Sequence, residues 1–182
     1  HYELPVVTRR RAELDARELA PFRAAVAAGV GAVMSAHVVY TSLDTQAPAT
    51  FSARILTDLL RGEMGFSGLV ITDAMDMGAV AKGGALHTAE TAIRAGVDLV
   101  LLGHLPDQHA LTRAARPMLT PASVARIGRV RESLPRAYPS LDEVGCAAHQ
   151  RIAQDIADAS ITVVRDDGRL PLRRSASGGV PD

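Results

Sequence analysis

The sequence contains very little cysteine, since Cys146 is the only one among 182 residues. A single cysteine excludes an internal disulfide and leaves the redox compartment open. No uninterrupted apolar run reaches the roughly 18 residues of a membrane-spanning helix, so we expect no transmembrane segment. Lysine is equally scarce. Lys82 is the one lysine among 20 basic residues, which suggests codon bias in a GC-rich genome more than a functional pattern.

An excess of charge of one sign is also missing, because Lys and Arg total 20 and so do Asp and Glu. A balanced chain offers no basic surface, so neither nucleic acid nor an anionic membrane is expected as a partner. Gly83 and Gly84 are not part of a G-x-G-x-x-G or a Lys-Ser/Thr pattern, so the sequence supports no phosphate loop. It also contains no G-x-S-x-G nucleophile motif.

The remaining composition is that of an ordinary soluble globular protein, with 47% apolar and 22% charged residues. The length is sufficient for one domain with a substantial core. The first residue is His1 and not Met, so we expect the natural start to lie upstream, and a lost leader is left open.

Short Val- and Leu-rich runs alternate with segments of helical periodicity. The expected strands are 32–40, 68–73 and 97–103, and the expected helices are 11–30, 52–64, 87–96, 107–119, 120–134 and 146–160. Pro21 is interpreted either as an early-turn proline or as a kink. Ser52 and Gly65 are the expected cap and stop of one helix, and Thr120 is the expected cap of another.

The expected strands end near Tyr40, Asp73 and Gly103, about 33 and 30 residues apart. They are apolar throughout, as strands covered on both faces are. Alternation of this kind predicts an α/β fold with a parallel sheet. Eight units of about 31 residues make a (β/α)8 barrel of roughly 250 residues. A doubly wound open sheet would show the same local pattern, so the periodicity alone leaves both folds open.

Three stretches with different properties follow one another. Residues 1–134 carry the βα units. Residues 135–172 comprise a Pro-containing linker, a helix and then a strand and turn over 161–172, which we interpret as the start of a second α/β domain. Residues 173–182 are expected to form a disordered tail.

Polar residues at the ends of the expected strands are the candidates for chemistry, because strand C-termini face the active site in α/β folds. Asp73 follows an apolar strand directly, and its alternative role, or that of Asp76, is to cap the next helix. His37 lies inside an apolar run, where a hydrogen-bonded core histidine is the alternative to a ligand. His104 and His109 are five residues apart, which is not the spacing of a helical zinc pair. We therefore expect no metal site and no cofactor.

Three segments together resemble glycoside hydrolase family 3: "PFRAAVAAGVGAVMSAHVVY", "PATFSARILTDLLRGEMGFSGLVITDAMDMGAV" and "AIRAGVDLVLLG". The resemblance extends from residue 1 to about residue 172, and it is greatest to the β-N-acetylhexosaminidase branch. It implies a TIM-like barrel, of which this chain would supply the last three or so βα units. It also implies that Asp73 is the nucleophile of a retaining glycosidase.

In this branch the acid/base is a His on a loop, two residues after an Asp, and His1 falls at that place. The alternative is that His1 is an accidental first residue. The family's K-H-F-P-G-H stretch, whose Lys and His hold the sugar, does not occur in the sequence. We therefore expect an incomplete catalytic domain that is inactive alone, with the rest of the barrel outside this chain. His37 and His104 are further candidates for substrate contacts.

The resemblance implies an enzyme that removes terminal β-linked N-acetylglucosamine from glycans or peptidoglycan fragments, with a carbohydrate as its only expected partner. Three alternatives stay open: a β-glucosidase or β-xylosidase of the same family, a non-catalytic sugar-binding remnant, and an unrelated nucleotide-binding α/β domain. The compartment is also open between the bacterial cytoplasm and export.

Overall fold

A computed structural model describes residues 3–135 and 137–167 of the chain. The chain divides into two compact units, unit 1 (His1–Leu134) and unit 2 (Pro135–Asp182). The division falls where the sequence composition predicts a linker to begin. The interpretation of the two stretches as part of a barrel and the start of a second domain stays a prediction. No helix within the described ranges is both long and apolar enough to cross a lipid bilayer.

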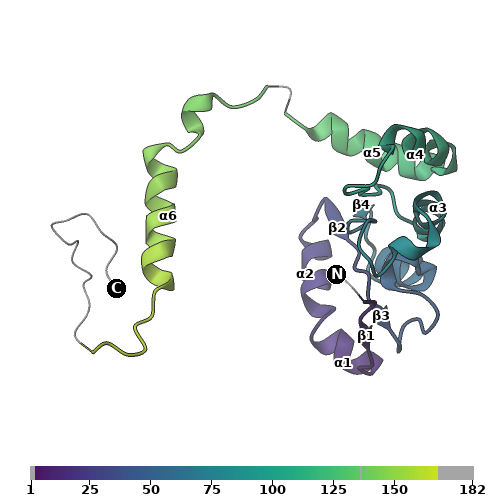
Figure 1. The fold of residues 1–182 in the computed structure, drawn as a ribbon, viewed down its shortest axis with the longest axis horizontal. Coiled ribbons are helices and arrows are strands. Elements are labelled where there is room, and N and C mark those ends of the chain that lie inside the picture. Colours follow the sequence, from purple (N-terminus) through teal and green to yellow (C-terminus); the bar gives the residue numbers. More distant parts are fainter. Residues whose placement is uncertain (1–2, 136, 168–182) are drawn as a thin grey trace. The chain divides into compact units, whose positions relative to one another are not determined.

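Short parallel strands alternate with helices in unit 1 (Figure 1). Its elements in chain order are β1 (Val6–Val7), α1 (Arg11–Ala16), α2 (Ala20–Ala27), β2 (Ala32–Met34), β3 (Val39–Tyr40), η1 (Ala49–Phe51), η2 (Arg54–Glu63), β4 (Leu69–Ile71), η3 (Ala81–Gly83), α3 (Ala85–Ala95), α4 (Gln108–Ala115), η4 (Arg116–Met118) and α5 (Pro121–Ser133). Unit 2 contains η5 (Leu141–Glu143) and α6 (Ala147–Ser160). The mixed α/β class expected from the sequence is confirmed.

Every strand pairing is parallel. β1 pairs with β3, and β2 pairs with β4 so that Val33 lies opposite Val70. The expected strand 97–103 is reduced to a single parallel bridge between Leu99 and Ile71. Each of these two pairings skips one labelled strand, but β2 and β3 belong to the same run, 32–40. If they are taken together, the order β1, 32–40, β4 and residue 99 follows the chain, as sequential βα units require.

The expected strand 32–40 is divided into β2 and β3. After Ser35, whose N–H donates to the Ile71 carbonyl at 2.7 Å, the backbone turns away from β4. The carbonyls of residues 36 and 38 instead accept hydrogen bonds from the N–H groups of Thr50 and Ala49, at 3.3 and 2.8 Å. The 3-10 turn η1 thus takes the hydrogen bonds that a continuous strand would have made, which composition alone does not reveal.

The expected helix 11–30 is likewise divided, into α1 and α2. Pro21 occupies the first turn of α2, where its missing N–H removes no helical hydrogen bond. The expected capping role of Ser52 is confirmed, because its hydroxyl accepts a hydrogen bond from the Ile55 N–H at 3.2 Å. Gly65 ends this helix in the left-handed conformation, with φ of 73°. The helix η2 itself is a π-helix, and its last turn is closed by a bond from the Met64 N–H to the Leu59 carbonyl.

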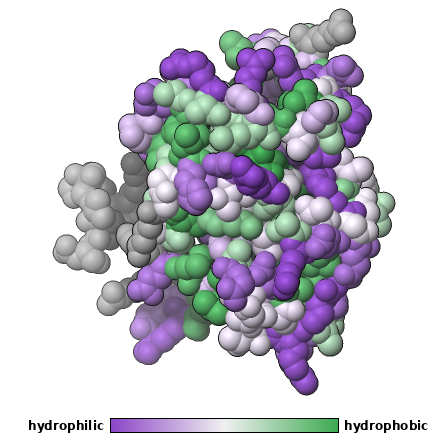
Figure 2. Space-filling model, turned by 90° about the vertical axis from the view of Figure 1, so that its right-hand side faces the viewer, coloured by the Kyte–Doolittle hydropathy of each residue, from purple (hydrophilic) through white to green (hydrophobic). Residues whose placement is uncertain are grey.

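The core of unit 1 lies where η2 and α3 pack on β4. Its buried members are Leu56, Leu60, Phe66, Val70, Ala92, Ala95 and Val97. The opposite face of the strands is different, because Met34 and Leu99 are 54% and 37% exposed. Apolar groups also reach the surface among hydrophilic ones on the side that carries α3 and α4 (Figure 2). The described residues therefore cover one face of the strands well, whereas the sequence predicts two covered faces.

In unit 2, α6 confirms the helix expected over 146–160, and no residue of α6 is buried. The strand expected from residue 161 is wrong for residues 161–167, which are irregular. The remainder of that expected element, 168–172, and the expected disordered tail, 173–182, lie outside the described residues.

Candidate active site

Asp73 stands two residues beyond the end of β4, on a segment that is tied to the next strand. The Thr72 N–H donates to the Leu99 carbonyl at 3.0 Å, and the Thr72 hydroxyl accepts from the Leu101 N–H at 2.9 Å. The Met75 N–H in turn donates to the Leu101 carbonyl at 2.9 Å. Hydrogen bonds on both sides of Asp73 therefore hold its backbone in one position.

The Asp73 carboxylate is half-buried, and its two oxygens have different environments. Oδ1 accepts a hydrogen bond from the Ala74 N–H at 2.8 Å. Oδ2 makes no hydrogen bond or ion pair with any part of the chain that the structure describes. The carboxylate is thus oriented through one oxygen while the other is available to a ligand.

The capping alternative can now be tested for both carboxylates. The helices that follow are the 3-10 helix η3 and then α3, and their N-cap residues, Val80 and Gly84, are not accompanied by any side-chain cap. Asp73 bonds only the next residue's N–H, and Asp76 accepts from the His104 N–H at 2.7 Å. Neither carboxylate therefore caps α3.

His37 is buried directly beneath the Asp73 segment. Its Nε2 lies 3.1 Å from the Ala74 carbonyl oxygen, and its Nδ1 lies 2.9 Å from the Thr50 hydroxyl. A carbonyl oxygen can only accept, so Nε2 carries a proton and donates it. In the neutral ring Nδ1 then accepts from Thr50, whose oxygen is also 3.0 Å from the Ser35 hydroxyl. His37 has both ring nitrogens engaged and fixes the backbone next to Asp73.

His104 lies at the end of the neighbouring strand segment, and its side chain is exposed. Only its backbone N–H takes part in the local network, through the bond to Asp76. The preceding Gly103 has a φ of 64°, and a β-carbon there would clash with the carboxylate of Asp76. Asp76 therefore joins the loop after β4 to the loop after Leu99. The sequence pointed to Asp76 only as a capping residue and missed this role.

His37, Asp73 and His104 thus belong to connected loops at one end of the strands. Their roles as nucleophile and substrate contacts are not tested by this geometry and stay predictions. His1 lies outside the described residues. Three side chains of types that can bind a metal ion converge in another part of the chain, in unit 2: Glu143, Cys146 and His149.

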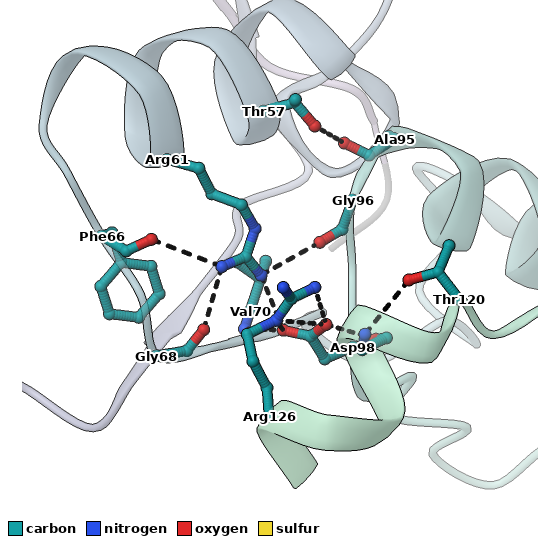
Figure 3. Close-up of polar contacts among 11 residues, drawn as sticks. Thr57, Arg61, Phe66, Gly68, Val70, Ala95, Gly96, Asp98, Thr120 and Arg126 are labelled. Atoms are coloured by element: carbon teal, nitrogen blue, oxygen red, sulfur yellow. Dashed lines mark hydrogen bonds and ion pairs between the residues drawn. The ribbon is translucent and has the colours of Figure 1, made fainter.

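The largest concentration of buried charge in unit 1 involves Asp98, at the start of the strand segment that ends near His104. Asp98 Oδ1 and Oδ2 each lie 2.7 Å from a guanidinium nitrogen, of Arg126 and Arg61 respectively (Figure 3). The Val70 N–H also donates to Oδ2, at 2.9 Å, and the Ser123 hydroxyl donates to Oδ1. This Asp98 cluster connects η2, β4 and α5.

Arg61 extends the Asp98 cluster to the backbone. Its guanidinium donates to the carbonyls of Gly68 and Gly96, at 3.0 and 3.4 Å, which precede two neighbouring strand segments (Figure 3). The residues near Asp73 follow those same segments. In parallel α/β folds, the N-terminal end of the strands serves stability and the C-terminal end serves catalysis. The sequence pattern did not reveal this cluster, because its three charged residues are 28 to 65 positions apart.

Burial by itself raises the pKa of Asp98. The hydrogen bonds from Arg126, Ser123 and the Val70 N–H, together with the charge of Arg61, outweigh that effect and hold the pKa below its usual range. Burial also lowers the pKa of Arg61, and Asp98 partly opposes this shift. The carboxylate is therefore ionised in the folded protein, and its charge is shared between two guanidinium groups.

An apolar cavity in unit 1 lies apart from this arrangement. It measures about 120 Å³ and is lined by residues of α1, α2, β2 and η2, including Leu14 and Phe22. Neither Asp73, His37 nor His104 lines it. Its size is well below the several hundred Å³ of ordinary ligand pockets, so we interpret it as a packing gap.

Comparison with known proteins gives a consistent picture. Residues 1–123 match the family described as glycosyl hydrolase family 3 N terminal domain. A beta-hexosaminidase of Chromobacterium violaceum is 40% identical over 132 residues, which are 71% of this chain and 37% of that protein. A beta-hexosaminidase A of Pseudoalteromonas piscicida is 32% identical over 97% of this chain and 35% of its own length.

A solved glycoside hydrolase family 3 beta-N-acetylglucosaminidase from Paenibacillus sp. str. FPU-7 superposes with a TM-score of 0.77 and 32% identity. The match covers 96% of this chain and 36% of that one. The chain thus spans about a third of the length of the relatives it matches. It belongs to glycosyl hydrolase family 3.

Proposed function

We propose that the protein is a retaining exo-β-N-acetylglucosaminidase in which Asp73 is the nucleophile. The observation that carries this proposal is the Asp73 carboxylate, which is held at a strand end by one oxygen with the other unengaged. Relatives at 32–40% identity bear the name beta-hexosaminidase, which supports the same reaction. Because the chain covers only part of their length, the proposal concerns the intact gene product.

The strand geometry supports a partial (β/α)8 barrel over a doubly wound sheet. With β2 and β3 taken as the two parts of the run 32–40, the order β1, 32–40, β4 and residue 99 follows the chain, whereas a doubly wound sheet reverses its order at a switch point. Met34, Ile71 and Leu99 lie side by side on the less covered face. That face would become the barrel interior when the remaining strands are present. Alternation along β4 places Asp73, two residues after Ile71, on this same side.

The chemistry follows from this placement. Asp73 Oδ2 attacks the anomeric carbon and forms a glycosyl-enzyme as the glycosidic bond breaks. The Ala74 N–H holds Oδ1, which fixes the direction of attack. An acid/base must protonate the leaving oxygen and then take a proton from the water that releases the sugar. On sequence resemblance alone, His1 is the candidate for this role, with a pKa range suited to both steps.

His37 acts in this proposal as a positioning residue and not as a sugar ligand, because both its ring nitrogens are occupied within the protein. His104 is the better candidate for a substrate contact, since its side chain is exposed at the same end of the strands. The substrate class is a terminal β-linked N-acetylglucosamine. Peptidoglycan fragments are one source of it, which would place the enzyme in cell-wall recycling.

The test is to trap the glycosyl-enzyme. The intact gene product is incubated with an activated, ring-fluorinated N-acetylglucosaminyl donor, and the labelled peptide is identified by mass spectrometry. We expect the label on Asp73, net retention at the anomeric carbon, and loss of turnover by several orders of magnitude in Asp73→Asn. The exposed Asp58→Asn variant is the matched control. A label on another carboxylate, or inversion, would refute the proposal.

Nitrophenyl glycosides separate the alternatives within the family. A preference for the N-acetylglucosaminide supports the proposal, whereas a preference for the glucoside or xyloside assigns the protein to the other branch. Sugar binding that persists in Asp73→Asn without any turnover in the unmodified gene product would indicate a non-catalytic binding protein. Assayed in parallel, the 182-residue chain alone should show no turnover, because it lacks the K-H-F-P-G-H stretch.

A further inference from the structure

Three side chains of different chemistry meet in unit 2, away from the residues discussed above. They are the carboxylate of Glu143, the thiol of Cys146 and the imidazole of His149, and one ligand atom from each lies within 4.8 Å of the other two. The spacing is E-x2-C-x2-H. The sequence contains the signal as a Cys and a His three residues apart.

The backbone explains why the three converge. η5 ends at Glu143, and Gly145 then turns the chain with a φ of 67°, a conformation that favours glycine. Cys146 is the N-cap residue of α6 and His149 lies in its first turn, so the two side chains share one face of the helix. The side-chain amide of Gln150 donates a hydrogen bond to the Gly145 carbonyl at 2.7 Å, which links the turn to the first turn of α6.

In the described part of the chain, no other group competes for these three side chains. Within the described residues none of them takes part in a hydrogen bond or an ion pair. The neighbouring Asp142 provides a contrast, because its carboxylate lies 3.0 Å from the Ser140 hydroxyl. Cys146 is half-buried, whereas Glu143 and His149 are exposed, so the group is open to an ion from solvent.

We propose that Glu143, Cys146 and His149 form a binding site for a divalent zinc ion. Thiolate and imidazole ligands together select zinc over magnesium or calcium, and a carboxylate oxygen completes many zinc sites. Bonds of about 2.0–2.3 Å place tetrahedral ligands roughly 3.5 Å apart, so side-chain rotations must close the present spacing by about 1 Å. Three protein ligands leave the fourth position to water.

The bound ion would stabilise the start of α6. This helix has 14 residues and no buried side chain, and an isolated helix of that length is marginal because its first turn is costly to form. An ion held by Cys146 and His149 fixes that first turn, and Glu143 ties it to η5. The site therefore gives unit 2 a source of order that its apolar contacts do not supply.

The test uses the full chain, purified without a histidine tag and kept reduced with a phosphine. Cobalt(II) is the spectroscopic probe and zinc the competitor. Because Cys146 is the only cysteine, a thiolate-to-cobalt charge-transfer band can arise from no other residue of the chain. We expect this band at one cobalt per chain, its loss on addition of zinc, and an increase in helical circular dichroism on zinc binding.

The variants Cys146→Ser, His149→Gln and Glu143→Gln should each weaken zinc binding at least about 100-fold, since even loss of an outer-sphere partner costs roughly 10- to 100-fold. His87→Gln, which alters an exposed histidine of α3, is the control and should bind as the unmodified chain does. Three results would overturn the proposal: absence of the band, a band unchanged in His149→Gln and Glu143→Gln, or half an ion per chain with dimer formation.

Discussion

Replacement of Asp98 by Asn is the most demanding test of the fold, because it removes the one negative charge between Arg61 and Arg126. The Asp98 side chain is 0% exposed, and the two arginines are 16% and 18% exposed. Neither cation can recover full hydration, and the new amide group would direct N–H donors at guanidinium donors. Loss of one partner from a buried ion pair costs about 3–5 kcal/mol.

That loss is a large part of the 5–15 kcal/mol that stabilises a typical domain. For a domain of this size it corresponds to a fall in melting temperature of about 10–20 °C. Urea unfolding followed by circular dichroism measures the effect as a lower midpoint with an unchanged slope. Asp58→Asn on the exposed side of η2 is the control, and its effect should stay within about 0.5 kcal/mol.

A double-mutant cycle isolates the interaction itself. Arg126→Met in the Asp98→Asn background removes one of the two uncompensated cations, so the double variant should be more stable than the sum of the single effects predicts, by about 1–3 kcal/mol. The reasoning is refuted if Asp98→Asn unfolds at the same urea concentration as Asp58→Asn, or if the two changes are simply additive.

Three further outcomes are expected. The pKa of Asp98 is held below its usual range in the folded state, so the stabilisation that its charge provides is present above the unfolded pKa of about 3.9 and is lost as pH falls through the folded value. The difference in free energy of unfolding between the unmodified protein and Asp98→Asn, measured by urea titration, should therefore be full at pH 7 and decrease below about pH 4. Gly103→Ala adds a clash with Asp76 to a backbone strain of about 1–3 kcal/mol, whereas Gly29→Ala, also at positive φ but with open space, adds the strain alone. Equal urea midpoints would contradict the close approach. His37→Phe releases the Ala74 carbonyl, so kcat of the intact enzyme should fall about 100-fold with little change in KM, and an unchanged kcat would remove His37 from the positioning role.

The alternation of strands and helices could be predicted from the sequence because it depends on local patterns. Ser52, Gly65 and Thr120 mark helix ends through their own backbone and side-chain chemistry, and the structure places them there. The division of 32–40 into two strands could not be predicted in this way. It depends on hydrogen bonds from η1, which lies beyond the loop that follows β3 and has no distinctive periodicity.

The candidate site, too, could be predicted from the sequence only in part. Asp73 could be singled out because a carboxylate directly after an apolar strand is unusual. The roles of His37 and Asp76 depend on which backbone group lies opposite each side chain, and that information comes only from the folded chain. The Asp98 cluster was missed for a related reason, since a charge inside an apolar strand does not reveal which cations will neutralise it.

The Asp98 cluster also limits where genes of related proteins can recombine. In a recombinant of a fold built from successive βα units, a block of units is replaced by the corresponding block of a relative. Arg61, Asp98 and Arg126 come from three successive blocks. If the sequence switches from one parent to the other between any two of them, a buried charge must be neutralised by a residue from the other parent. Exchange points before Arg54 or after Arg126 keep the three residues together. Surviving chimaeras of this protein should therefore keep this segment as a single piece.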